Sequence, residues 1–238
     1  MRAPTVVDTT DTQARILDAA ERLFMQHGFA ATSLRMITAS ARVNLAAVHY
    51  HFGSKEGLIR AVFGRRLGAL NGARIARLER LEADAKGRVL TVEQIVGAMV
   101  EASRDLSRRA RGGPIFLKLL GRAFAEPTEC LRDFLPEQYR EVVRRFKAAF
   151  KRALPYLTDQ EIGWRMHFAF GTLAYAMAGV DAARVIATCK LKDAENTEAV
   201  LAHLVPIMVA GFKAPATGKH GGGKAKTRNA RVGVAQGT

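Results

Sequence analysis

The segment TSLRMITASARVNLAAVHYHFGSKEGL, residues 32–58, contains three closely spaced helix starts. At each start a short polar side chain can accept a hydrogen bond from a free backbone N–H group: Ser33, Asn44 and Ser54. The spacing therefore predicts three successive helices, at about 33–40, 45–51 and 54–70.

The first two of these helices are joined by Ala41-Arg42-Val43, a turn short enough for a helix-turn-helix motif. On the second helix, Val48 and Phe52 lie four residues apart and would pack against the first helix. Four residues are then left to face outward: Leu45, Ala46, His49 and Tyr50. Small side chains and polar tips suit close approach to bases in the major groove of DNA. The pattern therefore predicts that helix 45–51 contacts DNA.

The charge of the chain also favours a polyanionic partner. Lysine and arginine number 37 against 22 aspartates and glutamates, which gives a formal net charge of +15 and a pI of about 10.5. Residues 33–66 contain a single acid, Glu56, and six basic residues: Arg35, Arg42, Lys55, Arg60, Arg65 and Arg66. We expect this local excess to lie where DNA phosphates would be.

The rest of the chain is also helical in pattern. Ahead of the motif, apolar residues at helical spacing predict a helix at about 12–27, with Gly28 placed to end it. Behind the motif, helical spacing recurs between breaks of glycine, proline and polar residues, at 92–108, 114–124, 136–154, 159–180 and 196–212. No segment shows the two-residue alternation of a half-buried strand. The predicted fold class is all-α.

Several classes of protein are disfavoured. The longest stretch without a charged residue, 166–180, is shorter than the about 20 residues that a membrane-spanning helix needs. The N-terminus has no apolar run of a signal peptide, and Cys130 and Cys189 form no disulfide framework, so we expect a reduced, cytoplasmic protein. His49 and His51 lie on different helix faces, which disfavours a zinc pair. Without a nucleotide-binding glycine loop, GxSxG or HExxH, no enzyme, cofactor or metal is expected.

The motifs of residues 12–60 resemble the TetR family of bacterial transcriptional regulators. The resemblance runs through Arg15 to Ala20, Leu23-Phe24, Gly28-Phe29, Thr32 to Arg35, Ala41 to Asn44, Ala47 to Phe52 and Gly53 to Leu58. It implies that the first three helices bind double-stranded operator DNA and that the remaining helices form a regulatory domain holding a ligand. It also implies that the last two long helices pair across a two-fold axis. Residues 43–48 and 50–55 are further similar to the fatty-acid-responsive branch.

The resemblance divides the chain into four parts. A disordered N-terminus, 1–11, precedes a helix-turn-helix DNA-binding domain, 12–60, and a ligand-binding and dimerisation domain, 61–212. The tail, 213–238, carries six basic residues and no acid, and its composition predicts disorder. We expect Ala174 and Leu204 to lie on the dimer face.

The chain departs from the family pattern at two positions. The family commonly has glycine where this chain has Arg42, which suggests that the turn residue need not be left-handed here. It commonly has tyrosine where this chain has His49, so a phosphate contact of the tyrosine type is in doubt at that position.

The candidate DNA-binding residues come from the three helix starts and the outward face. Lys55 begins a helix, where free N–H groups already favour a phosphate, and the family counterpart of Arg35 reaches DNA. Ser33 and Asn44 cap their helices and could also donate to a phosphate. The full set is Ser33, Arg35, Asn44, Leu45, Ala46, His49, Tyr50 and Lys55.

The candidate ligand-binding residues lie in the C-terminal helices. The apolar candidates are Phe116, Leu120, Phe124, Phe146, Phe150, Phe168 and Met177, all of which could equally serve to fill a helical core. Three polar groups embedded in the apolar pattern could meet a ligand carboxylate or phosphate: Arg122, Arg165 and His167.

These patterns favour a homodimeric, ligand-responsive DNA-binding regulator, usually a repressor, without catalytic activity. The branch resemblance suggests that its ligand is a fatty acid or an acyl-CoA, and a drug-like apolar molecule is the alternative. A different class, a non-specific architectural DNA-binding protein that uses the basic tail, also stays open. Operator preference over random DNA at one salt concentration separates the two classes.

Overall fold

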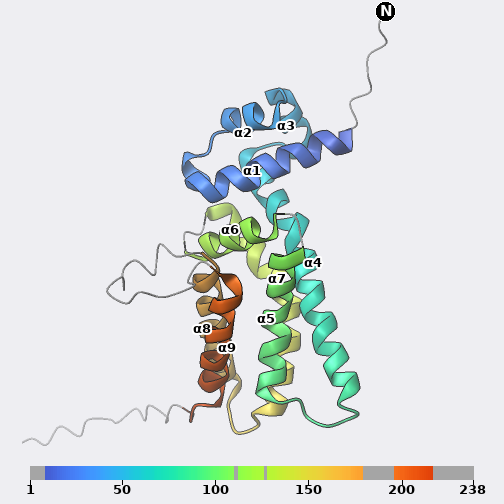
Figure 1. Ribbon diagram of the computed structural model, residues 1–238, viewed down its shortest axis with the longest axis vertical. Helices are drawn as coiled ribbons and strands as arrows, with labels where there is room; N and C mark the ends of the chain where they lie inside the picture. The colour runs from blue at the N-terminus through green and yellow to red at the C-terminus, as the bar shows by residue number, and fades with distance from the viewer. Residues whose placement is uncertain (1–8, 110–111, 126–127, 179–195, 217–238) are drawn as a thin grey trace, which may run out of the picture.

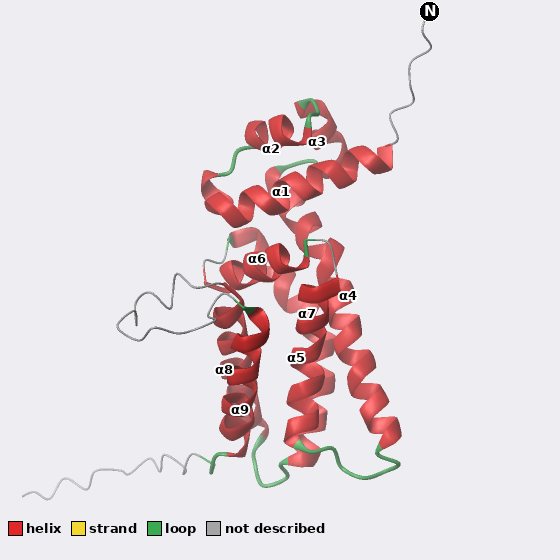
Figure 2. Cartoon of the chain, in the orientation of Figure 1, coloured by secondary structure: helices red, strands yellow, loops and turns green. Residues whose placement is uncertain are grey.

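The described part of the chain is built of α-helices alone. The computed structural model describes residues 9–109, 112–125, 128–178 and 196–216, and within them it contains helices, turns and loops without a strand (Figure 2). The all-α prediction is confirmed. The helices are α1 (Thr9–Ala31), α2 (Leu34–Ala41), α3 (Leu45–Phe52), α4 (Lys55–Asp84), α5 (Val92–Arg109), α6 (Gly113–Ala125), α7 (Glu129–Ala153), α8 (Asp159–Ala178) and α9 (Thr197–Lys213).

The helices form a small unit at one end and an elongated bundle behind it (Figure 1). Helices α1 to α3 make the small unit, and α4 runs from it along the length of the molecule beside α5 and α7. Helices α8 and α9 pack against each other, and α6 lies across the top of the bundle in contact with α1, α5 and α8. Thus α4 and α6 are the two helices that connect the small unit to the bundle.

One hydrophobic core runs through both parts. In the small unit, Ile16, Phe24 and Val48 are fully buried. At its base the Phe63 ring lies 6.1 Å from the Phe29 ring and 5.9 Å from the Phe116 ring, measured between centroids. The aromatic contact therefore joins the helix-turn-helix unit to α6 of the bundle.

Three helices are longer than the sequence pattern predicts. Helix α1 spans Thr9–Ala31 instead of about 12–27, so residues 9–11, which we expected to be disordered, are helical; Gly28, placed to end the helix, has non-helical backbone angles (φ 83°, ψ 170°).

Helix α4 continues to Asp84, whereas we expected an end near residue 70. The apolar stripe of α4 is interrupted by Asn71 and Arg74, which are buried and hydrogen-bonded, so the helix goes on where the apolar pattern fades. Helix α7 begins at Glu129 and runs through Pro136, where we expected the helix to start. Pro136 is exposed to solvent, so water can hydrogen-bond the carbonyl that it leaves unpaired.

The expectation that Arg42 need not be left-handed is wrong. Its backbone has φ 54° and ψ 51°, the left-handed conformation that ends α2, and its N–H donates to the carbonyl of Ala39. The Arg15 guanidinium donates to the carbonyls of Ala41 (2.7 Å) and Arg42 (2.8 Å). These contacts help to hold a conformation that costs a non-glycine residue about 1–2 kcal/mol. The left-handed turn is therefore present although this chain has Arg42 where the family commonly has glycine.

Candidate functional site

The outer face of α2 and α3 carries seven of the eight candidate DNA-binding residues as exposed side chains. These are Ser33, Arg35, Asn44, Leu45, Ala46, His49 and Tyr50, while Lys55 is half-buried. Tyr50 is 81% exposed, and Val48, two residues earlier, is fully buried and anchors α3 to the core. Phe52 is half-buried and packs against the same core, as its spacing from Val48 predicts. Helix α3 therefore presents a small-residue and polar face to solvent.

Three side chains cap the helix starts as predicted. The Ser33 hydroxyl accepts from the N–H of Met36 (3.2 Å), and the Asn44 carbonyl oxygen accepts from that of Ala47 (2.8 Å). The Ser54 hydroxyl accepts from the N–H of Gly57 (3.1 Å). Each cap satisfies one of the four free N–H groups of its helix start. The remaining groups and the helix dipole favour an anion there.

The start of α4 lies next to the end of α1. The Lys55 ammonium donates to the carbonyl of Ala30 (3.3 Å), an exposed contact three residues before the Ser33 cap. The pKa of Glu56, beside it, is lowered chiefly by its own backbone N–H and then by the Ser54 hydroxyl. Glu56 is therefore ionised at neutral pH and offsets part of the positive charge of Lys55.

The His49 ring is held by a hydrogen bond within its own helix end. Its Nδ1 lies 2.9 Å from the carbonyl oxygen of Gly53, so Nδ1 carries the proton. In the neutral ring Nε2 is then a hydrogen-bond acceptor. Because the side chain is exposed, this acceptor is accessible on the outer face of α3.

Three of the six basic residues in 33–66 are held by groups of other helices. Arg65 and Arg66 form ion pairs with the buried Glu21, and Arg65 also pairs with Asp18 at 2.7 Å. The Arg60 guanidinium donates to the carbonyl of Cys130 in α7 (3.3 Å). These three side chains are thus engaged by α1 and α7 in the structure, whereas the sequence predicts that all six basic residues lie where DNA phosphates would be. Of the other three, Arg35 and Arg42 are exposed on α2 and in the turn after it, and Lys55 is half-buried at the start of α4.

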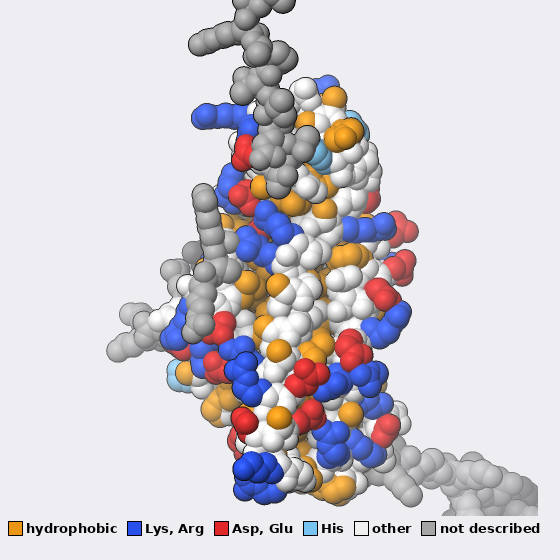
Figure 3. All heavy atoms as spheres, turned by 90° about the vertical axis from the view of Figure 1, so that its right-hand side faces the viewer, with side chains coloured by type: hydrophobic (Ala, Val, Ile, Leu, Met, Phe, Trp, Pro, Cys, Tyr) orange, Lys and Arg blue, Asp and Glu red, His pale blue; other side chains and the backbone are white. Residues whose placement is uncertain are grey.

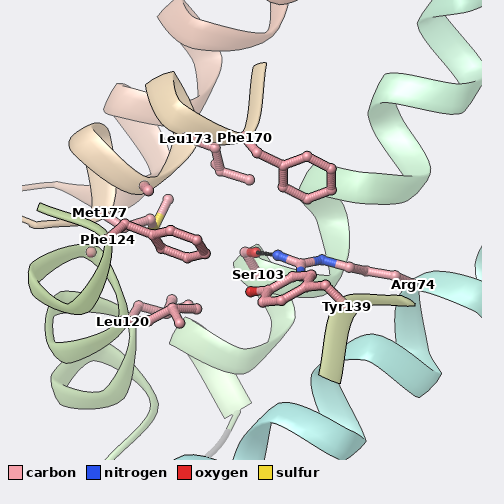
Figure 4. Close-up of a pocket in the computed structure, with 11 residues that line it drawn as sticks. Arg74, Ser103, Leu120, Phe124, Tyr139, Phe170, Leu173 and Met177 are labelled. Carbon is pink, nitrogen blue, oxygen red and sulfur yellow. Dashed lines mark hydrogen bonds between the residues drawn. The ribbon is translucent and has the colours of Figure 1, made fainter. Parts of the chain in front are cut away.

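A small pocket, with about 20 Å³ open to the centres of water-sized groups, lies in the bundle between α4, α5, α6, α7 and α8 (Figure 4). This is far below the about 300–1,000 Å³ of typical small-molecule sites, so a ligand would have to displace lining side chains. Three predicted ligand-binding residues line it: Leu120, Phe124 and Met177. The other lining residues are Arg74, Ser103, Leu117, Gly121, Tyr139, Phe170, Leu173 and Ala174, which the sequence analysis did not select as ligand contacts.

The polar lining of this pocket comes from Arg74, Ser103 and Tyr139. Arg74 was missed because we ended its helix near residue 70. An available signal was its spacing: it lies four residues before the buried Leu78 and four after the buried Leu70, inside an apolar stripe.

The other predicted ligand residues lie elsewhere. Phe116 packs on Phe63, and Phe146 and Phe150 are fully buried, with Phe150 stacked on Phe212 at 3.9 Å between centroids. His167 and Phe168 are exposed on α8.

The two predicted cationic ligand contacts bind backbone carbonyls instead. The Arg122 guanidinium donates to the carbonyl of Met25 in α1 (2.8 Å). That of Arg165 donates to the carbonyls of Phe212 (2.6 Å) and Ala214 (2.7 Å) at the end of α9. Neither lines the pocket, because each is engaged at the end of another helix.

Helices α8 and α9 expose large apolar side chains on their surface. Trp164, Phe168 and Tyr175 on α8 are 54%, 63% and 56% exposed, and Ile207 on α9 is 65% exposed. By contrast, Ala174 and Leu204 are buried within the protomer, so our expectation that they lie on an outer face is wrong. The face shown in Figure 3, on the α4 side of the molecule, is not apolar in this way: acidic and basic side chains are interspersed over most of it.

Among the residues that the structure describes, no helix is both long and apolar enough to cross a membrane. The same residues include no group of three or more His, Cys, Asp or Glu side chains placed to hold a metal ion. Cys130 is buried, and Cys189 lies outside the described residues, as do residues 1–8 and 217–238 of the two predicted disordered ends.

Comparisons with known proteins match both parts of the chain. A family model described as "Bacterial regulatory proteins, tetR family" matches residues 16–62, and one described as "Tetracyclin repressor-like, C-terminal domain" matches residues 97–211. The HTH-type transcriptional repressor Rv3405c of Mycobacterium tuberculosis is 31% identical over 171 residues, covering 72% of this chain and 79% of the relative. The HTH-type transcriptional regulator UidR of Escherichia coli is 39% identical over 51 residues, covering 21% of this chain and 26% of UidR.

Solved structures share the fold. The triclosan complex of SmeT, the repressor of the Stenotrophomonas maltophilia multidrug efflux pump SmeDEF, aligns with a TM-score of 0.56 at 23% identity. The alignment covers 87% of this chain and 96% of that one. FadR of Bacillus subtilis, in complex with stearoyl-CoA, aligns with a TM-score of 0.55 at 16% identity, covering 83% of this chain and 98% of that one. At these identities the likeness concerns the arrangement of the helices.

Proposed function

The chain belongs to the TetR family of bacterial transcriptional regulators, and on that premise we propose that it is a homodimeric repressor that leaves its operator when a small molecule fills the bundle pocket. The observation that carries the DNA-binding part is the solvent-exposed face of α3. Leu45, Ala46, His49 and Tyr50 lie on it, over a buried anchor at Val48. In this proposal these four residues contact base edges, while Ser33, Arg35, Asn44 and Lys55 contact phosphates.

The homodimer proposal rests on the apolar surface of α8 and α9. Trp164, Phe168, Tyr175 and Ile207 are each more than half exposed, and large exposed apolar patches mark protein–protein contacts. Pairing the two helices with those of a second copy would cover them around a two-fold axis. Such symmetry would present two α3 helices to two half-sites of DNA.

The ligand proposal rests on the pocket beneath α6. Its lining is mostly apolar, so it suits a small apolar or acyl molecule. Among the structures that share the fold, FadR is in complex with stearoyl-CoA and SmeT with triclosan. These two complexes illustrate the acyl and the drug-like alternatives. The pocket offers only about 20 Å³ to the centres of water-sized groups, which is room for about one or two water molecules, so an acyl or a drug-like ligand would require lining side chains to move.

Helix α6 provides a physical route from the pocket to DNA. Leu120 and Phe124 face the pocket, and Arg122, on the same helix, donates to the carbonyl of Met25 in α1. A ligand that displaces α6 would therefore displace α1 and the helix-turn-helix unit with it. Release follows if the ligand binds more tightly to a conformation whose α3 helices no longer match the two half-sites.

Replacing Lys55 with alanine is expected to weaken binding to operator and random DNA alike. A lysine that neutralises one phosphate releases one counterion, so its loss should reduce the slope of log K against log salt by about one unit per protomer. Fluorescence anisotropy with labelled duplexes over a salt series measures this slope.

The matched control is Arg80→Ala, an exposed cation 25 residues further along α4 and thus about 37 Å away. This variant should keep the wild-type slope. An unchanged slope in Lys55→Ala would remove Lys55 from the interface.

A further inference from the structure

A buried cation lies in the wall of the bundle pocket. Arg74, in the middle of α4, is 2% exposed. Its guanidinium donates to three neutral acceptors: the Asn71 side-chain oxygen (3.0 Å), the Met99 carbonyl (3.2 Å) and the Ser103 hydroxyl (3.1 Å). It also lies over the Tyr139 ring, 5.8 Å from the centroid (Figure 4). Arg74 is therefore fixed in place by polar and aromatic groups.

Among the described residues, no carboxylate is a partner of Arg74. On α5, Asp105 pairs with Arg77 and Glu101 pairs with Arg104. Arginine stays protonated in proteins, so its charge cannot be lost by titration. A buried charge without a counter-ion is costly, and such charges are normally paired.

The same wall offers further hydrogen-bond donors. A guanidinium has five N–H groups, and the three hydrogen bonds of Arg74 leave two of them. The Tyr139 hydroxyl makes no hydrogen bond to the described residues, and Tyr139 lines the pocket next to Arg74. One cation and one hydroxyl thus converge on one side of the pocket.

The opposite side of the pocket is apolar. It includes Leu120, Phe124, Leu173 and Met177, whereas the Phe170 ring, which also lines the pocket, packs against the Tyr139 ring. Figure 4 shows Leu120, Phe124, Leu173 and Met177 grouped across the pocket from the Arg74 guanidinium. A ligand that satisfies both sides has an apolar body and an anionic head.

We infer that the pocket binds a monocarboxylate with a compact apolar body, whose carboxylate accepts hydrogen bonds from Arg74 and Tyr139. This inference deepens the proposed function, since it assigns a ligand class to the site that would regulate DNA binding. The carboxylate supplies the missing counter-charge of Arg74 in a site from which water is largely excluded. Because the pocket offers only about 20 Å³ to the centres of water-sized groups, the apolar lining side chains would move apart to admit the body of the ligand.

The test compares carboxylates with their uncharged amides on the full chain in the absence of DNA. Isothermal titration would measure octanoate against octanamide, and hydrocinnamate against hydrocinnamamide, which differ mainly in the charge of the head group. At least one carboxylate is expected to bind about tenfold or more tightly than its amide, since hydrogen bonds between ionised groups are the strong ones.

Arg74→Met is expected to remove this preference, because it keeps an apolar side chain of similar length and deletes the charge. Binding of the favoured carboxylate should weaken by about 10- to 100-fold while that of the amide changes little. Arg77→Met, one turn further along α4, is the matched control: Arg77 pairs with Asp105 and does not line the pocket. It should keep the carboxylate preference.

Tyr139→Phe is a second variant in case Arg74→Met does not fold, because it deletes only one oxygen atom and should preserve the fold. It should weaken carboxylate binding by a smaller factor, about two- to tenfold. Three results would overturn the inference: amides that bind as tightly as carboxylates, no binding of either carboxylate to the wild type, or wild-type affinity for carboxylates in both variants. DNA binding of the same preparations is measured separately, so each of these results leaves the operator proposal standing.

Discussion

Replacing Phe168 with aspartate is expected to turn the proposed dimer into a monomer and to lower operator affinity by about 100-fold or more. Phe168 is 63% exposed on α8, so the change should leave the protomer folded and place a charge in the apolar contact. Two linked DNA-binding units gain about 10²–10⁴ in affinity over one because the second contact becomes intramolecular. Sedimentation and anisotropy measured on the same preparation test both consequences.

The control for Phe168→Asp is Val143→Asp on α7. Val143 is also an exposed apolar residue, at 41%, but it lies outside α8 and α9. This variant should remain a dimer with wild-type affinity. Wild-type protein that sediments as a monomer at micromolar concentration would rule out the homodimer.

Replacing Glu21 with alanine is expected to lower the free energy of unfolding by about 3 kcal/mol. The Glu21 side chain is 3% exposed and pairs with Arg65 and Arg66, which join the small unit to the bundle. Removing the carboxylate leaves two partly buried guanidinium groups without that partner, and this is the costly way to break a buried ion pair. Chemical denaturation followed by circular dichroism gives the value.

Asp18→Ala is the matched control for Glu21→Ala, since Asp18 pairs with the same Arg65 but is 46% exposed. Exposed pairs are worth about 0–1 kcal/mol, so its loss should be small. Equal losses in the two variants would show that burial does not make the Glu21 contact stronger than the exposed one.

The helix-turn-helix unit could be predicted because its signals are local in sequence. The caps Ser33, Asn44 and Ser54 each bond to a backbone N–H three residues ahead, and Val48 anchors α3 as its spacing predicts. Arg42 shows the limit of such local reasoning. The left-handed turn is kept there with the help of Arg15, which is 27 residues away in sequence.

The pocket could not be predicted in the same way, because the partners of its polar groups are distant in sequence. Arg122 and Arg165 look alike in an apolar pattern, but each binds carbonyl groups at the end of another helix. Arg74 meets Met99 and Ser103 only once α4 and α5 have packed. For the same reason the sequence could not show that Arg65 and Arg66 pair with Glu21 of α1, or that Arg60 donates to the Cys130 carbonyl of α7.

We propose above all that α3 recognises a specific operator as part of a two-fold dimer. Selection of bound duplexes from a randomised DNA pool, at one fixed salt concentration, tests it most directly. We predict enrichment of an inverted repeat, and we predict that Tyr50→Ala changes which bases are enriched within each half-site while the two-fold symmetry remains. A pool that stays random after repeated rounds would contradict the claim and favour a non-specific DNA-binding protein.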